Sequence, residues 1–214
     1  FLAITINYVD RLIFGVLKPV LEVEFGWSES DYANIVVAFQ GAYAIGLLLV
    51  GRMIDRVGAR WGLGIAIGVW SLAATAHAGA SSVLQFAMAR FALGIGESAG
   101  FPGAVKAVSE WFPKRERALA TGIFNAGSNV GALLTPILVP ILVLAFGWRA
   151  AFIITGLSGL VLMALWFLVY RRPRENPRVT AAELAHIESD PPDAPGKISW
   201  GQALKRREAW AFIV

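Results

Sequence analysis

Apolar blocks of about 20 residues recur along the chain and alternate with short charged segments. A helix needs about 20 apolar residues to cross the roughly 30 Å of hydrocarbon in a bilayer. No basic segment or cleavage site precedes the first block, so it is interpreted as a shortened membrane helix rather than a signal peptide. The pattern predicts six membrane-spanning helices, at about 1–23, 31–54, 62–80, 83–105, 118–143 and 150–170.

The segment after the sixth block is rich in proline and charge, which predicts a linker outside the membrane. Within it, Thr180 is followed three residues later by Glu183, a capping-box spacing that predicts one short surface helix ending at Pro191-Pro192. A further apolar run begins near residue 208 and predicts a seventh membrane helix. The expected domains are a six-helix bundle at 1–170, the linker at 171–207 and the start of the seventh helix at 208–214.

Composition supports an all-α polytopic membrane protein. Hydrophobic residues make up 57% of the chain and charged residues 16%, whereas soluble domains are about 25% charged. Because the chain has no cysteine and only two distant histidines, His77 and His186, we expect no metal site and no cofactor. His77, near the outer end of the third span, is expected at the membrane interface.

The charged loops predict an orientation. Basic residues gather in 54–61, 110–117 and the linker, whereas the opposite loops are acidic or nearly uncharged. Basic loops of membrane proteins face the cytoplasm, so we expect these three segments there. The net charge of +4 then follows from topology, and nucleic-acid binding is not expected.

The loop "GRMIDRVGAR", residues 51–60, joins the second and third spans. It resembles the signature loop of the major facilitator superfamily, which reads glycine, three residues, aspartate, a basic residue, any residue, glycine and further basic residues. Ala59 departs from this pattern, whereas Arg60 keeps it. In that family the loop is a conformational latch, so the resemblance implies gating roles for Gly51, Asp55, Arg56 and Arg60.

The fourth span contains two charges, Arg90 and Glu97. Seven helical residues advance close to two turns and about 10 Å, so both side chains point the same way. An ionisable group at mid-bilayer costs about 2.5–3.5 kcal/mol, which predicts an aqueous pathway and a salt bridge between the two. The small residues nearby predict close helix packing at Gly94, Gly96, Gly100 and Gly103.

Polar residues also interrupt the first, second and fifth spans. Asp10 and Arg11 are adjacent and therefore point about 100° apart, so one is expected to face a cavity and the other a neighbouring helix. Gln40 and Tyr43 share nearly one face. The fifth span has a polar cluster that is expected either to bond neighbouring helices or to line a site, formed by Asn125, Ser128 and Asn129.

Longer stretches extend the resemblance beyond the superfamily. "NYVDR", "GIGESAGFPGAVKAVSEWFPKRERALATGIFNAGSNVGA", "FGWRAAF" and "ENPRVTAAELAHIESD" resemble the anion:cation symporter group, in particular its bacterial hexuronate, glucarate and galactonate transporters. That resemblance implies twelve helices in two six-helix bundles, of which this chain is the first. The implied partners are a sugar-acid anion, the lipid bilayer and a second bundle, in a monomer of the bacterial inner membrane.

The resemblance also implies residue roles. Arg11 and Tyr43 would contribute to the substrate cavity. Glu97 would be the principal proton carrier, with Asp10 and Arg90 taking part in coupling. A polar residue of the fifth span would touch substrate, which leaves Asn125, Ser128 and Asn129 as alternatives; the candidate substrate-binding set is therefore Arg11, Tyr43, Arg90, Asn125 and Ser128.

The expected function is proton-coupled import of a sugar-acid anion by alternating access, with H⁺ as coupling ion. A sodium-coupled or phosphate-exchanging carrier and a non-transporting sugar-acid receptor stay open as alternatives. A drug antiporter is disfavoured because "GSNVGALLTP" lacks the glycine-proline signature of that group. An enzyme is not expected, since the chain has no nucleophile and base pair, metal cluster or phosphate loop.

Overall fold

The computed structural model describes residues 1–190 and Lys205. Two predictions, the helix end at Pro191-Pro192 and the seventh helix near 208, lie outside the described residues. The described helices are α1 (Leu2–Phe25), α2 (Glu29–Ala76), the 3-10 turn η1 (His77–Gly79), α3 (Val83–Glu97), α4 (Gly100–Trp111), α5 (Lys114–Val169), the 3-10 turn η2 (Pro173–Glu175) and α6 (Ala181–Ile187).

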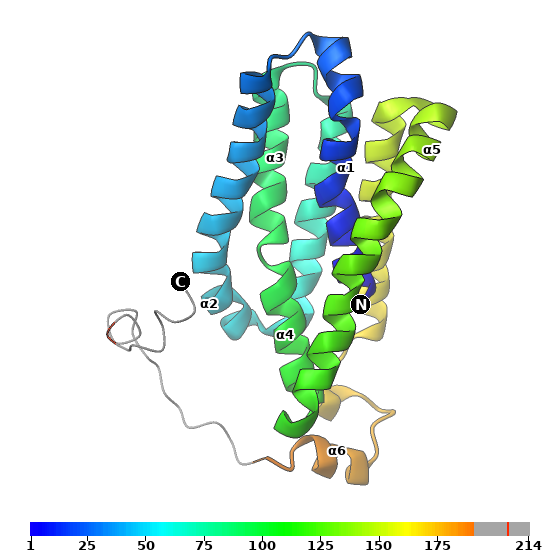
Figure 1. The fold of residues 1–214 in the computed structure, drawn as a ribbon. Coiled ribbons are helices and arrows are strands. Elements are labelled where there is room, and N and C mark those ends of the chain that lie inside the picture. The colour runs from blue at the N-terminus through cyan, green and yellow to red at the C-terminus, as the bar shows by residue number, and fades with distance from the viewer. Residues whose placement is uncertain (191–204, 206–214) are drawn as a thin grey trace.

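The two longest helices each fold back on themselves at one glycine. Gly58 in α2 has φ 78° and ψ 169°, and Gly147 in α5 has φ 81° and ψ 165°. Side chains disfavour this backbone region, so a glycine is needed where each chain reverses. Figure 1 shows the reversal of α5 at one end of the bundle. The halves of α2 and α5 therefore supply the second, third, fifth and sixth predicted spans.

The fourth span is longer than predicted and is interrupted. It comprises α3 and α4, which are separated by Ser98 and Ala99 immediately after Glu97. The glycines around the break bring backbones together, as predicted: a Cβ on Gly94 would lie 2.6 Å from the Phe39 carbonyl oxygen, and one on Gly96 would lie 2.7 Å from the Trp70 nitrogen. The close approaches thus lie just before the break, whereas a Cβ on Gly100, just after it, would meet no atom closer than 3.6 Å.

The described loops gather at two ends of the bundle (Figure 1). The turn at Gly58, the junction of α4 with α5 and the linker helix α6 lie at one end, which we call the basic end. The turns between α1 and α2, after η1 and at Gly147 lie at the other. The alternation of basic and non-basic loops is therefore as predicted, while the side of the membrane that each end faces stays a prediction.

The short helix α6 begins where its capping signal predicted. The Thr180 hydroxyl accepts a hydrogen bond from the Glu183 amide at 3.2 Å, and the helix runs from Ala181 to Ile187. The last turn of α6 contacts the start of α5, since His186 lies 3.0 Å from a Glu116 oxygen and 3.1 Å from an Arg115 nitrogen. This part of the linker is therefore held against the bundle.

Large apolar side chains cover much of the outside, as a bilayer requires. Leu144 is 88% exposed, Val169 74% and Leu168 73%. Inside, one aromatic cluster near the end opposite the basic end contains Phe14, Phe86 and Phe152, and His77 lies among these rings with no exposed surface. The predicted interfacial position of His77 is wrong, because aromatic side chains of α1, α3 and α5 enclose its ring.

Candidate functional site

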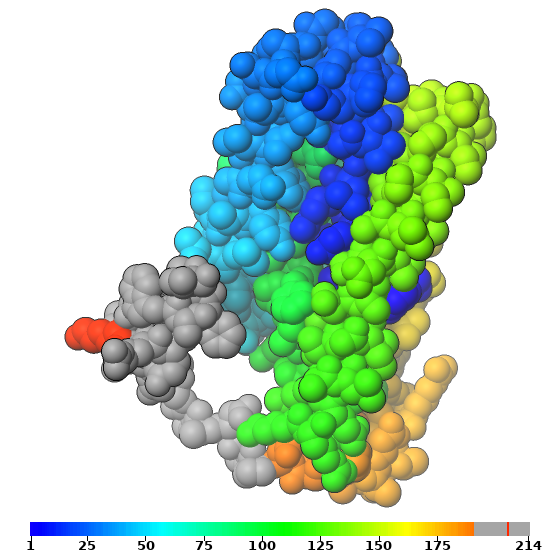
Figure 2. Space-filling view, viewed as in Figure 1, coloured from blue at the N-terminus to red at the C-terminus, as the bar shows by residue number. Residues whose placement is uncertain are grey.

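A cavity of about 280 Å³ opens between α1, the first half of α2 and α3. Figure 2 shows α1 recessed between α2 and α5, so that α1 forms the floor of a hollow on this face. The cavity is lined by Arg11, Leu12, Phe14, Gly15, Tyr32, Val36, Phe39, Gln40, Tyr43 and Arg90. Three of the five predicted substrate residues therefore share one cavity, namely Arg11, Tyr43 and Arg90.

Arg11 is the charged centre of the cavity wall. Its Nε donates to Glu97 Oε2 at 2.7 Å, and its guanidinium lies 4.7 Å from the Tyr43 ring centre and 5.0 Å from that of Tyr8. The Arg11 side chain is 23% exposed, whereas that of Glu97 is fully buried. Glu97 thus reaches the cavity only through Arg11.

This pairing corrects the salt bridge predicted within the fourth span. Arg90 does not pair with Glu97; both of its terminal nitrogens donate to the Arg11 backbone carbonyl at 3.2 Å. Its guanidinium also packs over the Phe14 ring, 4.2 Å from the centre. The reason is geometric: two helical turns separate Arg90 from Glu97, and α1 lies closer to each than they lie to one another.

Asp10 and Arg11 divide as predicted, one toward the interior and one toward the cavity. Asp10 is 1% exposed and does not line the cavity, whereas Arg11 does. Neither Asp10 oxygen has a hydrogen-bond partner among the described residues. A proton-coupling role for Asp10 and Glu97 stays a prediction.

The polar cluster of α5 lies apart from the cavity lining. Ser128 is 8% exposed, and its hydroxyl donates to the Asn125 carbonyl of its own helix at 2.6 Å. Asn125 and Asn129 are exposed, and within residues 1–190 their side chains bond no neighbouring helix. Contact of this cluster with substrate stays a prediction.

Several cavity residues were not predicted from the sequence. Tyr32 and Phe39 line the cavity with Tyr43, and Phe14 lines it with Arg11. Tyr32, Phe39 and Tyr43 follow one another at spacings of seven and four residues, which places them on one helix face. That aromatic stripe was the signal available in the sequence.

The gating candidates occupy the basic end and have different environments. Asp55 pairs with Lys106 at 3.3 Å, while Arg60 donates to the Phe167 carbonyl at 3.0 Å. Arg56 is exposed, and a Cβ on Gly51 would have no atom within 4 Å, so Gly51 is not a close-approach point in this bundle. Their latch role stays a prediction.

A second bond network holds the turn at Gly58 in place. Glu110 accepts a hydrogen bond from the Ala59 amide at 3.2 Å and another from the Tyr170 hydroxyl at 2.8 Å. The Arg172 guanidinium lies over Gly58, with Nη2 2.5 Å from where a Cβ would be. The basic loop is therefore tied to the end of α4 and to the start of the linker.

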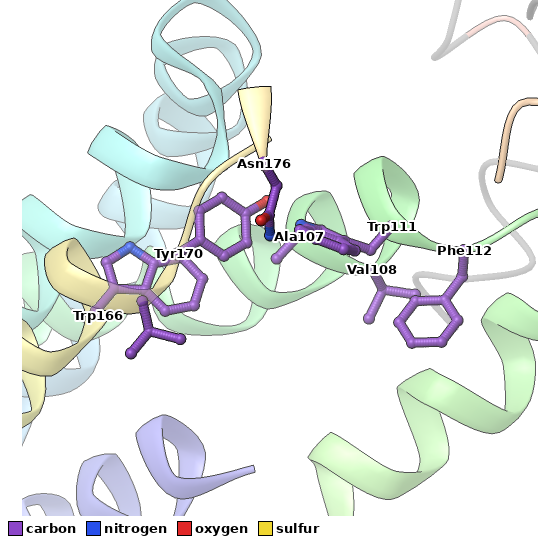
Figure 3. A pocket seen from close by; sticks show the side chains of 8 residues that line it. Ala107, Val108, Trp111, Phe112, Trp166, Tyr170 and Asn176 are labelled. Atoms are coloured by element: carbon purple, nitrogen blue, oxygen red, sulfur yellow. The ribbon is translucent and has the colours of Figure 1, made fainter. Parts of the chain in front are cut away.

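The basic end also contains a larger cavity, of about 430 Å³, which Figure 3 shows. Its lining is almost wholly apolar, with Trp166 stacked on Tyr170 at 4.1 Å between ring centres. No charged side chain lines it, so it does not suit an anion. The described residues also contain no group of three acidic, histidine or cysteine side chains that could hold a metal ion.

Comparison with known proteins places this geometry in a family. Residues 1–214 match the family model of the Major Facilitator Superfamily. The chain is 32% identical to the probable L-galactonate transporter and to the hexuronate transporter of Escherichia coli K12, over all of this chain and 48% and 50% of those proteins. It is 33% identical to the galacturonate transporter of Dickeya chrysanthemi, over 97% of this chain and 59% of that protein.

Solved structures agree on the fold. The chain resembles the inward-facing crystal structures of a bacterial homologue of the human lysosomal transporter Spinster. For the occupied form, the TM-score is 0.71 and the sequence identity 23%, over 80% of this chain and 43% of that one. For the unoccupied form, the TM-score is 0.72 and the sequence identity 22%, over 95% of this chain and 46% of that one. The chain spans about half the length of the curated relatives it matches. The chain forms one six-helix bundle of a transporter fold, and its family is one of transporters rather than enzymes. The chain belongs to the major facilitator superfamily.

Proposed function

We propose that the full-length protein is a proton-coupled symporter that imports a sugar-acid anion, a hexuronate, aldarate or aldonate, by alternating access. The relatives named above are transporters of galactonate, hexuronate and galacturonate, which supports this substrate class. The observation that carries the proposal is the ion pair between cavity-facing Arg11 and buried Glu97.

Arg11 suits the carboxylate of a sugar acid because its planar guanidinium can hold two oxygens at once. Tyr43 and Gln40, on the same wall, supply groups for sugar hydroxyls. The substrate carboxylate and Glu97 therefore compete for one cation. A proton on Glu97 removes its charge and leaves the guanidinium to the substrate.

In the proposed cycle, H⁺ loads Glu97 and the anion loads Arg11 from outside, after which the two bundles rock about the site. Neutralising Glu97 without a substrate would leave Arg11 unpaired in a closing, poorly hydrated site, which is costly. Empty protein instead keeps the Arg11–Glu97 pair. Closure is thus favoured either with both ligands bound or with neither, which is the requirement for symport.

The test is uptake of labelled glucuronate, galacturonate, galactonate and glucarate by the full-length protein, with and without a proton gradient. We expect one of these to accumulate only with the gradient. Glu97→Gln should keep exchange of that substrate and lose accumulation. Glu29→Gln, in an exposed pair with Lys18, is the matched control and should behave as wild type.

Two results would refute the proposal. One is wild-type accumulation by Glu97→Gln. The other is uptake that follows a sodium or phosphate gradient and ignores pH, which would support the other carriers of the same fold. Binding of a sugar acid without any uptake would instead support a receptor.

A further inference from the structure

Aromatic rings surround the two arginines that line the cavity. The guanidinium carbon of Arg11 lies 4.7 Å from the Tyr43 ring centre and 5.0 Å from that of Tyr8. It also lies 5.5 Å from the Phe39 ring centre, and the guanidinium carbon of Arg90 lies 5.5 Å from the centre of the same ring. Phe39 therefore presents one ring to both cations.

Close packing of α2 against α3 places Phe39 at this point. A Cβ on Gly94 of α3 would lie 2.6 Å from the Phe39 carbonyl oxygen and 3.1 Å from the Tyr43 nitrogen. Arg90 precedes Gly94 by four residues and so lies on the side of α3 that faces Phe39. The Phe39 ring is 6% exposed and stacks on the Tyr43 ring at 5.9 Å between centres. The ring is thus held where α2 and α3 meet, and Arg11 reaches it from α1.

Arg90 needs such rings because it is buried and, among the described residues, has no carboxylate in contact. It is 4% exposed, and its terminal nitrogens donate to the Arg11 backbone carbonyl. Its guanidinium lies over the rings of Phe14 and Phe39. A buried cation is costly unless polar groups compensate it. The negative face of an aromatic ring attracts a cation, and more strongly where water is excluded. The two ring faces and the carbonyl therefore stabilise the charge of Arg90.

Arg11 has a counterion, but the proposed cycle neutralises it. Glu97 accepts a hydrogen bond from Arg11 Nε at 2.7 Å, and a proton on Glu97 would remove the charge of this partner. A long side chain that loses its partner gains rotamer freedom, and ordering it again weakens binding. Phe39 has no ionisable group, so its attraction for the guanidinium does not depend on the charge of Glu97. The ring can therefore hold Arg11 in both states.

We propose that Phe39 is a positioning residue of the substrate site. Its ring keeps the Arg11 guanidinium at the cavity wall when Glu97 is neutral, and it helps to keep Arg90 buried without a carboxylate partner. Phe39 thus acts on the substrate through Arg11. This inference rests on the proposed function and adds to it a residue that has no polar side-chain group of its own.

The first test observes the Arg11 guanidinium by NMR in the full-length protein, purified without substrate. The Nε–H signal of Arg11 is assigned by its loss in Arg11→Lys. The background is Glu97→Gln, in which residue 97 stays uncharged at every pH. We expect one narrow Arg11 signal in Glu97→Gln, and a broadened or split signal when Phe39→Leu is added, because the side chain then takes up several positions. Phe39→Tyr, which keeps the ring, should restore the narrow signal.

The second test measures the affinity of the full-length protein for glucuronate, galacturonate, galactonate and glucarate. For any of these that wild type binds, Phe39→Leu should weaken binding about 2- to 12-fold at acidic pH, which corresponds to the cost of ordering one long side chain. The loss should be smaller at alkaline pH, where charged Glu97 holds Arg11 without the ring. In the Glu97→Gln background, the loss should not depend on pH.

Phe124→Leu is the matched control. Phe124 is 6% exposed, as Phe39 is, and its ring packs against Phe101 and Ile4 rather than against a guanidinium. The same substitution there removes the same ring, and it should change neither the Arg11 signal nor the affinity. Phe39→Tyr should restore the affinity. If Phe39→Leu does not fold, Phe39→Met takes its place, since methionine fills core space without a ring.

Three results would overturn the inference. One is a narrow Arg11 signal in folded protein that carries both Glu97→Gln and Phe39→Leu. Another is wild-type affinity in Phe39→Leu at acidic pH. The third is a loss of affinity that is as large in Phe124→Leu, or that Phe39→Tyr does not reverse. If wild type transports none of the four sugar acids, the proposed function fails separately, and the NMR test still decides whether the Phe39 ring holds Arg11.

Discussion

The interior of the bundle and its basic end both contain ion pairs, but the surroundings differ. In the interior pair, Glu97 is fully buried, the Arg11 side chain is 23% exposed, and the two charged groups lie 2.7 Å apart. In the pair at the basic end, the Asp55 side chain is 72% exposed, that of Lys106 is 31% exposed, and the charged groups lie 3.3 Å apart. Removing one member of a buried pair costs about 3–5 kcal/mol, because the other is left charged and unpaired. An exposed pair contributes about 0–1 kcal/mol. The interior pair is therefore suited to control a transition by its occupancy, and the exposed pair is not.

The basic end is held instead by bonds to the backbone. Glu110 accepts from the Ala59 amide, Arg60 donates to the Phe167 carbonyl and Trp166 donates to the Arg60 carbonyl at 2.9 Å. Such bonds fix the positions of chain segments, and two of the three use a backbone carbonyl as the acceptor rather than a carboxylate. The contrast is thus between a buried ion pair in the interior and an end that is held largely by hydrogen bonds to the backbone.

The largest effect should follow from changing the interior pair. Arg11→Lys keeps the charge and loses the planar fork, so we expect sugar-acid affinity to fall by about 2–4 kcal/mol, or roughly 30- to 1,000-fold. Competition binding to the full-length protein measures this. Arg149→Lys, in an exposed pair with Glu24 at 3.0 Å, is the control and should have wild-type affinity. Equal affinity for both variants would remove Arg11 from the substrate site.

The turn at the basic end should be the next most sensitive point. An alanine at Gly58 would have to adopt φ 78° and would also displace Arg172, so Gly58→Ala should destabilise the bundle by about 1–3 kcal/mol. Gly147→Ala would also have to adopt a positive φ, but its Cβ would have no atom within 4 Å. Gly51→Ala would require neither a positive φ nor the displacement of another side chain. Thermal unfolding in detergent should rank the loss of stability as Gly58 first, Gly147 second and Gly51 last. A loss at Gly147 as large as at Gly58 would contradict the contribution of Arg172, and a loss at Gly51 as large as at Gly147 would contradict the backbone argument.

The exposed pair should matter little for stability. Asp55→Asn removes its charge, and we expect the midpoint of thermal unfolding to change by less than the equivalent of about 1 kcal/mol. If Asp55 belongs to a latch, the same variant should nevertheless slow transport. A large loss of stability would contradict the distinction between the two regions, and an unchanged transport rate would contradict the latch role.

The smallest effect should be a pH dependence in the linker. Hydrogen bonds from Arg174, one of them at 2.9 Å, lower the pKa of Glu188 below its ordinary value of 4.5. A lowered carboxyl pKa stabilises the folded linker at pH values above 4.5, and this contribution is lost as the pH falls through the lowered pKa. A spin label on Ala182→Cys, in this cysteine-free chain, should thus become more mobile only in acid. When Glu188→Gln is combined with Ala182→Cys, the spin label should already be this mobile at neutral pH.

The membrane spans were predictable because their signal is local. Length and hydropathy identify each crossing, and glycine marks the reversals at Gly58 and Gly147. The same local reasoning predicted that one of Asp10 and Arg11 faces a cavity, the family resemblance implied Arg11 and Tyr43 for it, and both line the cavity while Asp10 is buried. It failed for His77, since hydropathy gives depth along a span but not which side chains of other helices will enclose a residue there.

The sequence by itself determined which residues bring charge into the membrane and roughly how deep each lies, because helix rise and hydrophobic length are fixed by covalent geometry and by the bilayer. The tertiary structure alone decided which charges meet. Arg90 and Glu97 share a helix, yet Glu97 pairs with Arg11 and Arg90 binds the Arg11 carbonyl. The physical reason is that side chains two turns apart cannot reach one another, whereas α1 presents the Arg11 side chain to Glu97 and the Arg11 carbonyl to Arg90.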